Sequence, residues 1–319
     1  MEYKFLLFMK GSRFSRRMDV KPGMTVKELV KEFGLAGYNG KRLSEAVEIY
    51  EKMIDDKDCV KVLTAAGALV AGGMRNVFVS FIRAGLVDVF IATGGSVLTH
   101  DIIEALGVHH VQGSSFVDDV KLAEKNVVRL YDVFLDKSGY TKVEDFLVEV
   151  MPKMPQKTMS PKEFFFELGK HIKDENSIIK ACYDMNVPIF CPSFTDSMTA
   201  FHAWVYSQNH DLKVNPQLDI KDIMEIVWQD KRFGALILGG GVPKHFIAGM
   251  MQASGKELDY AIQITLDRPE HGGVSGAPLK EAKSWKKVSA KGLVTDVISD
   301  VTLAFPIIVA ALLDYKANK

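Results

Sequence analysis

Cysteine is scarce in this chain of 319 residues, which has only Cys59, Cys182 and Cys191 and no CxxC pair. An odd number of cysteines cannot all pair within one chain, so the pattern favours a reducing compartment and small buried thiols. An excess of one charge is also lacking, because 40 basic residues balance 40 acidic ones. That balance argues against a broad nucleic-acid or membrane-binding surface, although a local charged patch could still receive a protein substrate.

Long apolar runs are lacking as well. No segment reaches the roughly 18 apolar residues of a membrane span. The run "FLLFM" (5–9) is too short for a signal peptide, its basic residues follow it, and no small-residue cleavage site comes after. We therefore predict an N-terminal arm over residues 1–20 that forms an edge strand or docks elsewhere, followed by a single α/β domain over 21–319. The apolar tail "LAFPIIVAALL" (303–313) predicts a buried helix.

Short apolar strands alternate with glycine turns and helices along most of the chain. This alternation is typical of βαβ units around a doubly wound, mostly parallel sheet with helices on both faces. A more charged stretch (134–172) predicts a lid or helical insertion. Amphipathic helices are expected over 25–34, with a cap at Thr25, and over 40–56; a further helix is expected over 74–85. Apolar strands are expected at 86–95, 186–194, 233–241 and 259–267, and helices at 98–107, from Asp196 and from Val242.

Three predicted strands open into a helix through small or polar residues: "ATGGS" (92–96), "PSFTDS" (192–197) and "LGGGVPKH" (238–245). Ligands of open parallel sheets bind at the carboxyl ends of strands, where glycines let the backbone approach a pyrophosphate. One such turn is usually only a tight turn, but three favour a nucleotide or cofactor site. The dinucleotide fingerprint G-x-G-x-x-G is missing.

Several polar residues near these turns have two interpretations each. His245 is either a ligand-binding or proton-transferring group or a solvated histidine. His100 and Asp101, like Thr195 and Asp196, could cap a helix or bind a ligand. The remaining candidates are expected to have no part in the chemistry: His109 and His110 have no partner at metal-like spacing, so no metal is expected, and Asp296 and Asp300 are expected to be surface acids.

The segment "EAKSWKKVSA" (281–290) carries a carboxylate and a tryptophan four residues apart, Glu281 and Trp285. On a helix they would share one face and suit a cationic amine. A lysine beside such an aromatic wall can become a better amine nucleophile. Two adjacent lysines, Lys286 and Lys287, are otherwise more often solvated charges.

The motifs "LGGGVPKH", "YAIQI", "GGVSGAPLKEAKSWKKV" and "SDVTLAFPIIVA" occur in the same order, and at similar separations, as in the deoxyhypusine synthases. The chain resembles that family over nearly its whole length, and its early part looks most like the archaeal members. The resemblance implies an NAD-dependent, cytoplasmic homotetramer with active sites at subunit interfaces. Such an enzyme oxidises spermidine, holds a four-carbon fragment as an imine on a lysine, and passes it to a lysine of the translation initiation factor 5A precursor. The cofactor carries the hydride chemistry, while the protein positions and tunes amines.

Carried over by position, the resemblance assigns the nucleophile to Lys287 and an active-site histidine to His245. Glu281 and Trp285 match the amine tunnel. The positions that match NAD contacts are Thr93, Gly94, Gly95, Asp196, Gly240, Gly241 and Asp300, with Ser275 in the matching "SGA" turn. The family usually has glycine at Lys286.

Other positions depart from the family pattern. Val274 and Phe201 replace acids, Gly249 replaces an asparagine, and Gly67-Ala68 replaces "SN". The first glycine turn also has "LTHD" in place of an acidic pair. Because an unpaired buried ammonium is costly, these losses predict a change in the accepted amine. Alternatives are therefore putrescine as acceptor, as in homospermidine synthases, or agmatine as donor. A non-catalytic paralogue is a third alternative, which the intact lysine, tryptophan, glutamate and histidine argue against.

Overall fold

Six parallel strands form the centre of the fold in this computed structural model, which describes residues 17–319. The sheet order is β7-β2-β1-β9-β10-β11, so chain order runs outward in both directions from β1 and β9. The strands are β1 (Cys59–Ala65), β2 (Val89–Ala92), β7 (Ile189–Phe190), β9 (Arg232–Leu238), β10 (Leu258–Thr265) and β11 (Val288–Ile298). The predicted mostly parallel α/β fold is confirmed. Most of the predicted arm lies outside the described residues.

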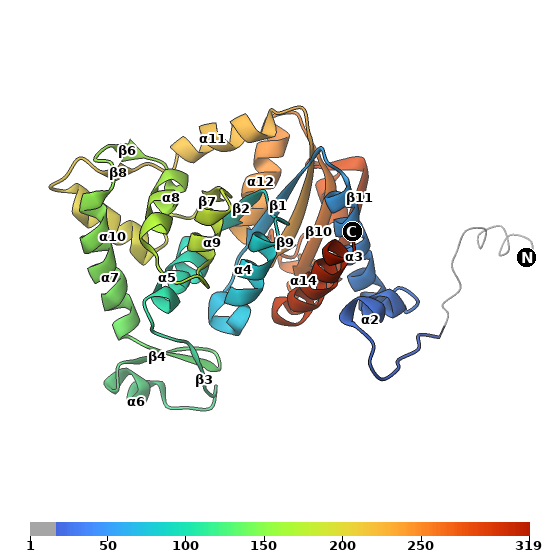
Figure 1. Ribbon diagram of the computed structural model, residues 1–319, viewed down its shortest axis with the longest axis horizontal. Coiled ribbons are helices and arrows are strands. Elements are labelled where there is room, and N and C mark those ends of the chain that lie inside the picture. Colours follow the sequence, from blue (N-terminus) through green and yellow to red (C-terminus); the bar gives the residue numbers. More distant parts are fainter. Residues whose placement is uncertain (1–16) are drawn as a thin grey trace, which may run out of the picture.

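Both faces of the sheet are covered by helices (Figure 1). The α-helices among residues 17–319 are α2 (Val26–Phe33), α3 (Tyr38–Asp55), α4 (Arg75–Arg83), α5 (His100–Ala105), α6 (Asp119–Glu124), α7 (Ser138–Val150), α8 (Pro161–His171), α9 (Ile178–Asp184), α10 (Met198–Ser207), α11 (Leu218–Val227), α12 (Gly241–Ala253), α13 (Leu279–Ala282) and α14 (Val301–Ala317). Among residues 17–319, no helix combines the length and apolarity needed to cross a membrane.

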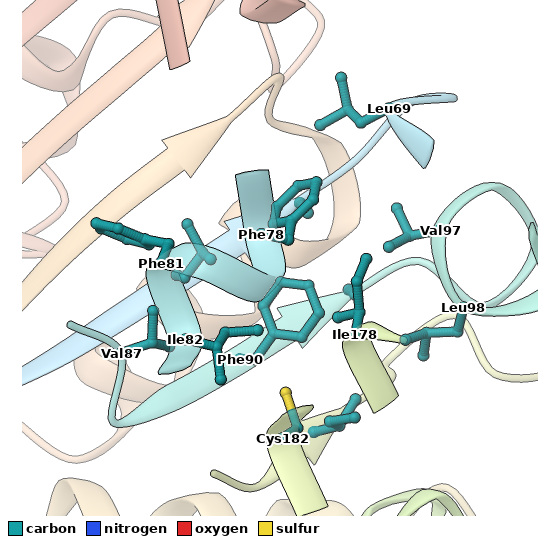
Figure 2. Packing of buried hydrophobic residues seen from close by; sticks show 14 of the residues in the cluster. Leu69, Phe78, Phe81, Ile82, Val87, Phe90, Val97, Leu98, Ile178 and Cys182 are labelled. Carbon is teal, nitrogen blue, oxygen red and sulfur yellow. The ribbon is translucent and has the colours of Figure 1, made fainter. Parts of the chain in front are cut away.

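Alternate residues of the central strands enter two separate cores. Leu63 and Phe90 pack in the core that includes α3, α4, α9 and α14, whereas Val62 and Ile91 pack in the one that includes α11 and α12. Figure 2 shows Phe78 of α4 beside Phe90, with ring centroids 5.8 Å apart. Because both faces are buried, β2 is wholly apolar and β9 is apolar after its first residue, which is the pattern that predicted a parallel sheet.

Local sequence signals fix several helix ends. Thr25 caps α2 in a reciprocal capping box with Glu28, and Gly34 ends the helix, as predicted. The predicted tail helix is α14, which contains Pro306 and buries an apolar face. The helix expected to start at Asp196 instead begins at Met198, because the Ser197 hydroxyl accepts from the backbone N–H of Ala200.

The insertion contains α7 and α8 and lies at one end of the sheet (Figure 1). A small antiparallel sheet with α6 stands away from the central sheet at the base of α7. It consists of β3 (Val111–Gln112), β4 (Val127–Leu130) and β5 (Val133–Asp136), while β6 (Thr158–Met159) and β8 (Lys213–Val214) form a separate parallel pair. The helical insertion was predicted, but its strands are too short to show in the sequence.

Asp219 of α11 is a buried carboxylate beneath the insertion. Its Oδ1 accepts from the Lys162 backbone N–H at 3.0 Å, while its Oδ2 lacks a partner, and burial raises its pKa to about 6. A folded-state pKa above the unfolded value means that the folded protein binds this proton more tightly. The stabilising effect is present below pH 4 and is lost as pH rises through about 6.

We therefore expect the Asp219→Asn variant to gain stability over the wild type as pH rises. The difference should be small at pH 4.5 and reach about 1–3 kcal/mol at pH 8, since about 1.4 kcal/mol corresponds to one pKa unit. Urea denaturation at both pH values measures it. The control Asp222→Asn alters a carboxylate paired with Lys162 at 2.6 Å and should show no such gain. A constant difference across pH would contradict the prediction.

Candidate functional site

The carboxyl ends of β1 and β9 lie side by side at the point where the strand order reverses. Loops leaving this point diverge, which makes it the usual ligand crevice of an open α/β sheet. The Ala66 backbone N–H donates to the Leu238 carbonyl at 3.1 Å, so the loop after β1 begins beside the triple-glycine turn (Gly239–Gly241). Gly67 has φ +89°, and a Cβ placed on it would meet no atom within 4 Å. The backbone there is open to a ligand.

The glycines after β2 have a different role, because they pack against the loop after β7. A Cβ on Gly94 would lie 2.9 Å from the Ser197 Cβ, and one on Gly95 would lie 2.9 Å from the Asp196 carbonyl oxygen. Thr93 precedes them, with its hydroxyl 2.7 Å from that of Ser96. Thr93, Gly94, Gly95 and Asp196, predicted to share one site, are thus brought together, and the two glycines permit the close approach.

The triple-glycine turn combines both roles. Gly240 has φ +149°, and a Cβ on it would lie 2.6 Å from the Ser275 Cα, so only glycine fits there. Gly241 has φ +57° but faces open space, and it begins α12. The predicted residues Gly240 and Ser275 therefore touch, while Gly241 presents a helix N-terminus that suits an anion.

Lys244, on the first turn of α12, is a functional candidate that the sequence did not reveal. Its side chain is only 6% exposed, and its Nζ donates to Gln263 Oε1 (2.7 Å) and to the carbonyls of Val274 (2.9 Å) and Ala277 (2.6 Å). Burial lowers the pKa of Lys244 to about 8, although the negative charges of Asp296 and Glu281 oppose that shift. The only sequence signal was its position in "GGGVPKH".

Ser275 lies in a loop held by several side chains. Its hydroxyl donates to Asp267, which also accepts from His271 at 2.7 Å; these bonds lower the pKa of Asp267 to about 2 and raise that of His271. Asp296, expected to be a surface acid, instead is half-buried and accepts from the Leu279 backbone N–H at 3.0 Å. It thereby caps the short helix that carries Glu281.

The prediction that Glu281 and Trp285 share a helix face is wrong. Helix α13 ends at Ala282, and Trp285 lies in the following turn, 55% exposed. The turn nevertheless brings Lys287 to the tryptophan, with Nζ 5.1 Å from the ring centroid, within the range of a cation–π contact. The Lys287 backbone is fixed at both ends, since its N–H donates to Ala282 and its carbonyl accepts from Leu258, each at 3.0 Å.

Lys286 occupies a position with φ +54°, in the left-handed region that favours glycine. The turn from Lys283 to Lys287 requires that conformation, since the Lys287 N–H returns to the Ala282 carbonyl. The side chain is exposed. This backbone geometry accounts for the glycine expected here from the resemblance, without any role for the extra charge.

We expect the Lys286→Gly variant to be more stable than the wild type by about 1 kcal/mol, because glycine removes the left-handed strain. Urea denaturation measures the change. A matched replacement, Lys280→Gly within α13, should instead destabilise the protein by a similar amount. Equal effects at the two positions would show that the backbone conformation at Lys286 is not the cause.

The other predicted residues occupy the same edge of the sheet. His245 is exposed on α12. Asp300, also expected at the surface, is half-buried, and its Oδ1 caps α14 by accepting from the Thr302 N–H at 2.7 Å. A Cβ on Gly72 would lie 3.3 Å from Thr302 Cγ2, so this cap lies near the loop that follows β1.

Hydrogen bonds within the protein occupy Asp101 and the three histidines near α5. His100 Nδ1 lies 2.7 Å from His110 Nε2, and both His109 and His110 contact Glu104 at 2.7 and 2.6 Å. Burial lowers the pKa of His100 to about 4. Asp101, which could have capped its own helix, instead accepts from the backbone N–H groups of Ile178 and Ile179 and caps α9. Among residues 17–319, no group of three or more His, Cys, Asp or Glu side chains is arranged so that it could hold a metal ion.

Comparison with known proteins decides the family. The deoxyhypusine synthase family model matches residues 28–312. The chain belongs to the deoxyhypusine synthase family. It is 40% identical to "Probable deoxyhypusine synthase 1" of Methanosarcina acetivorans over 92% of each chain, and 33% identical to a "Deoxyhypusine synthase-like protein" of Chlorobaculum parvum over 89% of this chain and 85% of that one.

A solved structure also has this fold. A crystal structure from Entamoeba histolytica, of a protein assigned to deoxyhypusine synthase, superposes with a TM-score of 0.63 at 20% identity, covering 93% of this chain and 96% of that one. Membership of the family implies a transferase.

The residues of the crevice fit a dinucleotide. Gly67 and Gly241 leave open backbone, α12 begins at the switch point, and the loops after β1 and β9 leave the sheet there. Gly94, Gly95 and Gly240 instead permit close packing between loops.

Proposed function

We propose that this protein is an NAD-dependent aminobutyl transferase that moves a four-carbon amine fragment from spermidine to a lysine of the translation initiation factor 5A precursor. The observation that carries the proposal is the placement of Lys287 against Trp285, beside the acid-bearing helix α13, in a chain of the deoxyhypusine synthase family. When bound, NAD would accept a hydride from the donor amine and later return it.

The protein's own residues would do the remaining chemistry. Lys287, as a free amine, adds to the oxidised carbon of the donor; a new C–N bond forms, and the remaining diamine leaves with a proton. Trp285 supplies an aromatic face and Glu281 a negative charge for the ammonium of the fragment. His245, on the adjacent helix, would orient an amine or transfer a proton.

The proposal includes assembly as a homotetramer in the cytoplasm. Trp285 and His245 are exposed in the single chain, and an amine site works best when water is excluded. A second copy over this face would supply that cover. Light scattering of the purified protein tests the assembly.

A small amine such as putrescine is the second candidate acceptor. Val274 is exposed in the loop above Lys244, Phe201 is 51% exposed on α10, and a Cβ on Gly249 would meet no atom within 4 Å. Each of these positions offers apolar surface or space where the resemblance implies a polar group. A site with fewer acids would hold fewer ammonium groups than spermidine carries. Agmatine is therefore the second candidate donor.

A labelled transfer assay distinguishes the acceptors. The enzyme is incubated with NAD, spermidine labelled in its four-carbon portion, and either purified factor precursor or putrescine. Label in the precursor protein alone supports the first proposal and excludes the small acceptor. Label in a small polyamine alone excludes the protein acceptor. Repeating the assay with labelled agmatine tests the donor.

A further inference from the structure

Lys244 and Gln263 form a buried polar pair between the triple-glycine turn and the loop before α13. Gln263, on β10, is 0% exposed, and its Nε2 donates to the carbonyls of Gly239 (3.0 Å) and Ser275 (2.7 Å). Its Oε1 accepts from Lys244. The pair therefore supplies donors to four backbone carbonyls, one in the glycine turn and three in the loop 274–277.

These bonds account for the shape of the loop. The carbonyls of Val274, Ser275 and Ala277 all point inward to the pair. Buried carbonyls without donors are costly, because they have lost their bonds to water. A loop of this conformation would therefore not persist if an apolar side chain replaced the ammonium, and the Gly240–Ser275 contact would loosen with it.

We propose that Lys244 is a positioning residue. With Gln263, its ammonium fastens the loop 274–277 to the triple-glycine turn and keeps Ser275, Gly240 and the N-terminus of α12 assembled before any ligand binds. The identity of that ligand as NAD rests on the proposed function. The fastening itself is a property of the unliganded chain.

The charge of Lys244 matters because an ammonium has three N–H donors for its three acceptors, whereas a neutral amine has two. The charged groups that act on it are Asp296, Glu281 and Lys287; the two acids favour the ammonium, and Lys287 opposes it. Burial brings its pKa to about 8. Because this pKa lies below the usual value for lysine, the opened loop binds the proton more tightly than the closed loop does. The closed loop should therefore be better protected as pH rises from 7 to 9.

Hydrogen exchange of the unliganded protein tests the fastening. In the Lys244→Met variant, amides of residues 273–279 should exchange about tenfold faster or more, while those of β9 keep their protection. The Gly276 N–H, which donates to Gly273 at 3.2 Å, reports directly. The matched control is Lys283→Met, because Lys283 also donates to two backbone carbonyls, at Ala290 (3.1 Å) and Gly292 (3.4 Å), but outside the loop.

The outcomes separate the alternatives. Unchanged exchange at 273–279 in Lys244→Met, or the same loosening in Lys283→Met, overturns the proposal. If Lys244→Met does not fold, the wild type decides: loop protection factors that rise between pH 7 and 9 support the proposal, and flat or falling ones overturn it. Calorimetric titration with NAD runs in parallel, and the Lys244→Met variant should bind at least about tenfold more weakly. If the wild type binds no NAD, the proposed cofactor is wrong, but the exchange result still tests whether Lys244 fastens the loop.

Discussion

Replacing Lys287 by alanine should abolish both the covalent enzyme–substrate adduct and the transfer of label to any acceptor. The imine requires a primary amine, and no other described lysine lies against Trp285. The adduct is measured by incubating the enzyme with NAD and labelled spermidine, reducing with borohydride, and counting label that stays with the protein. Loss of more than about a thousandfold is expected for a residue that forms the covalent bond.

Two matched variants make this result interpretable. Lys287→Arg keeps the positive charge and the contact with the aromatic ring, but a guanidinium forms no such imine, so this variant should fold, bind NAD and give no adduct. Lys286→Ala should retain the adduct, because the Lys286 side chain is exposed. The turn constrains the backbone of this residue and does not depend on its charge. Adduct and transfer that persist in Lys287→Ala would refute the assignment of the nucleophile.

The sequence predicted those features that depend on residues close together in the chain. Thr25 and its capping box, the periodic apolar face of α3 around Tyr50, and the strand–turn–helix units all follow from local propensity and periodicity. These units then imply a parallel sheet and a ligand site at its carboxyl edge.

Features that depend on distant residues were missed. Lys244 is buried only because Gln263 and the loop 274–277 surround it, and the sequence drew attention to its neighbour His245 instead. The predicted helix face of Glu281 and Trp285 does not exist, because the helix ends at Ala282 and the chain then turns through Lys286 in the left-handed conformation. Hydrophobic periodicity over seven residues cannot distinguish a helix from that turn.

Asp101 also depends on residues distant in the chain, and its replacement is expected to have the largest effect on stability. Its carboxylate is 0% exposed and accepts from Arg75 Nε (2.7 Å), the Ser177 hydroxyl (2.7 Å) and the N–H groups of Ile178 and Ile179 (3.0 Å each). It thus joins α4 and α5 to the start of α9, some 77 residues later. A capping interaction of this range has no local sequence signal.

The Asp101→Ala variant should lose about 3–5 kcal/mol of the free energy of unfolding. Removal of the carboxylate leaves the Arg75 charge short of a partner and several buried donors without an acceptor. Asp101→Asn should be little better, because the amide turns N–H groups toward backbone donors. The control is Asp174→Ala, which removes the other carboxylate on Arg75, at 2.7 Å, from a more exposed site and should cost about 1 kcal/mol. Urea denaturation measures all three. Asp101 lies on the helix that continues from the loop of Gly94 and Gly95. A loss of stability confined to that region would appear as faster amide exchange in α5 and α9 before global unfolding. Equal losses of unfolding free energy for Asp101→Ala and Asp174→Ala would contradict a role of Asp101 as the cap of α9.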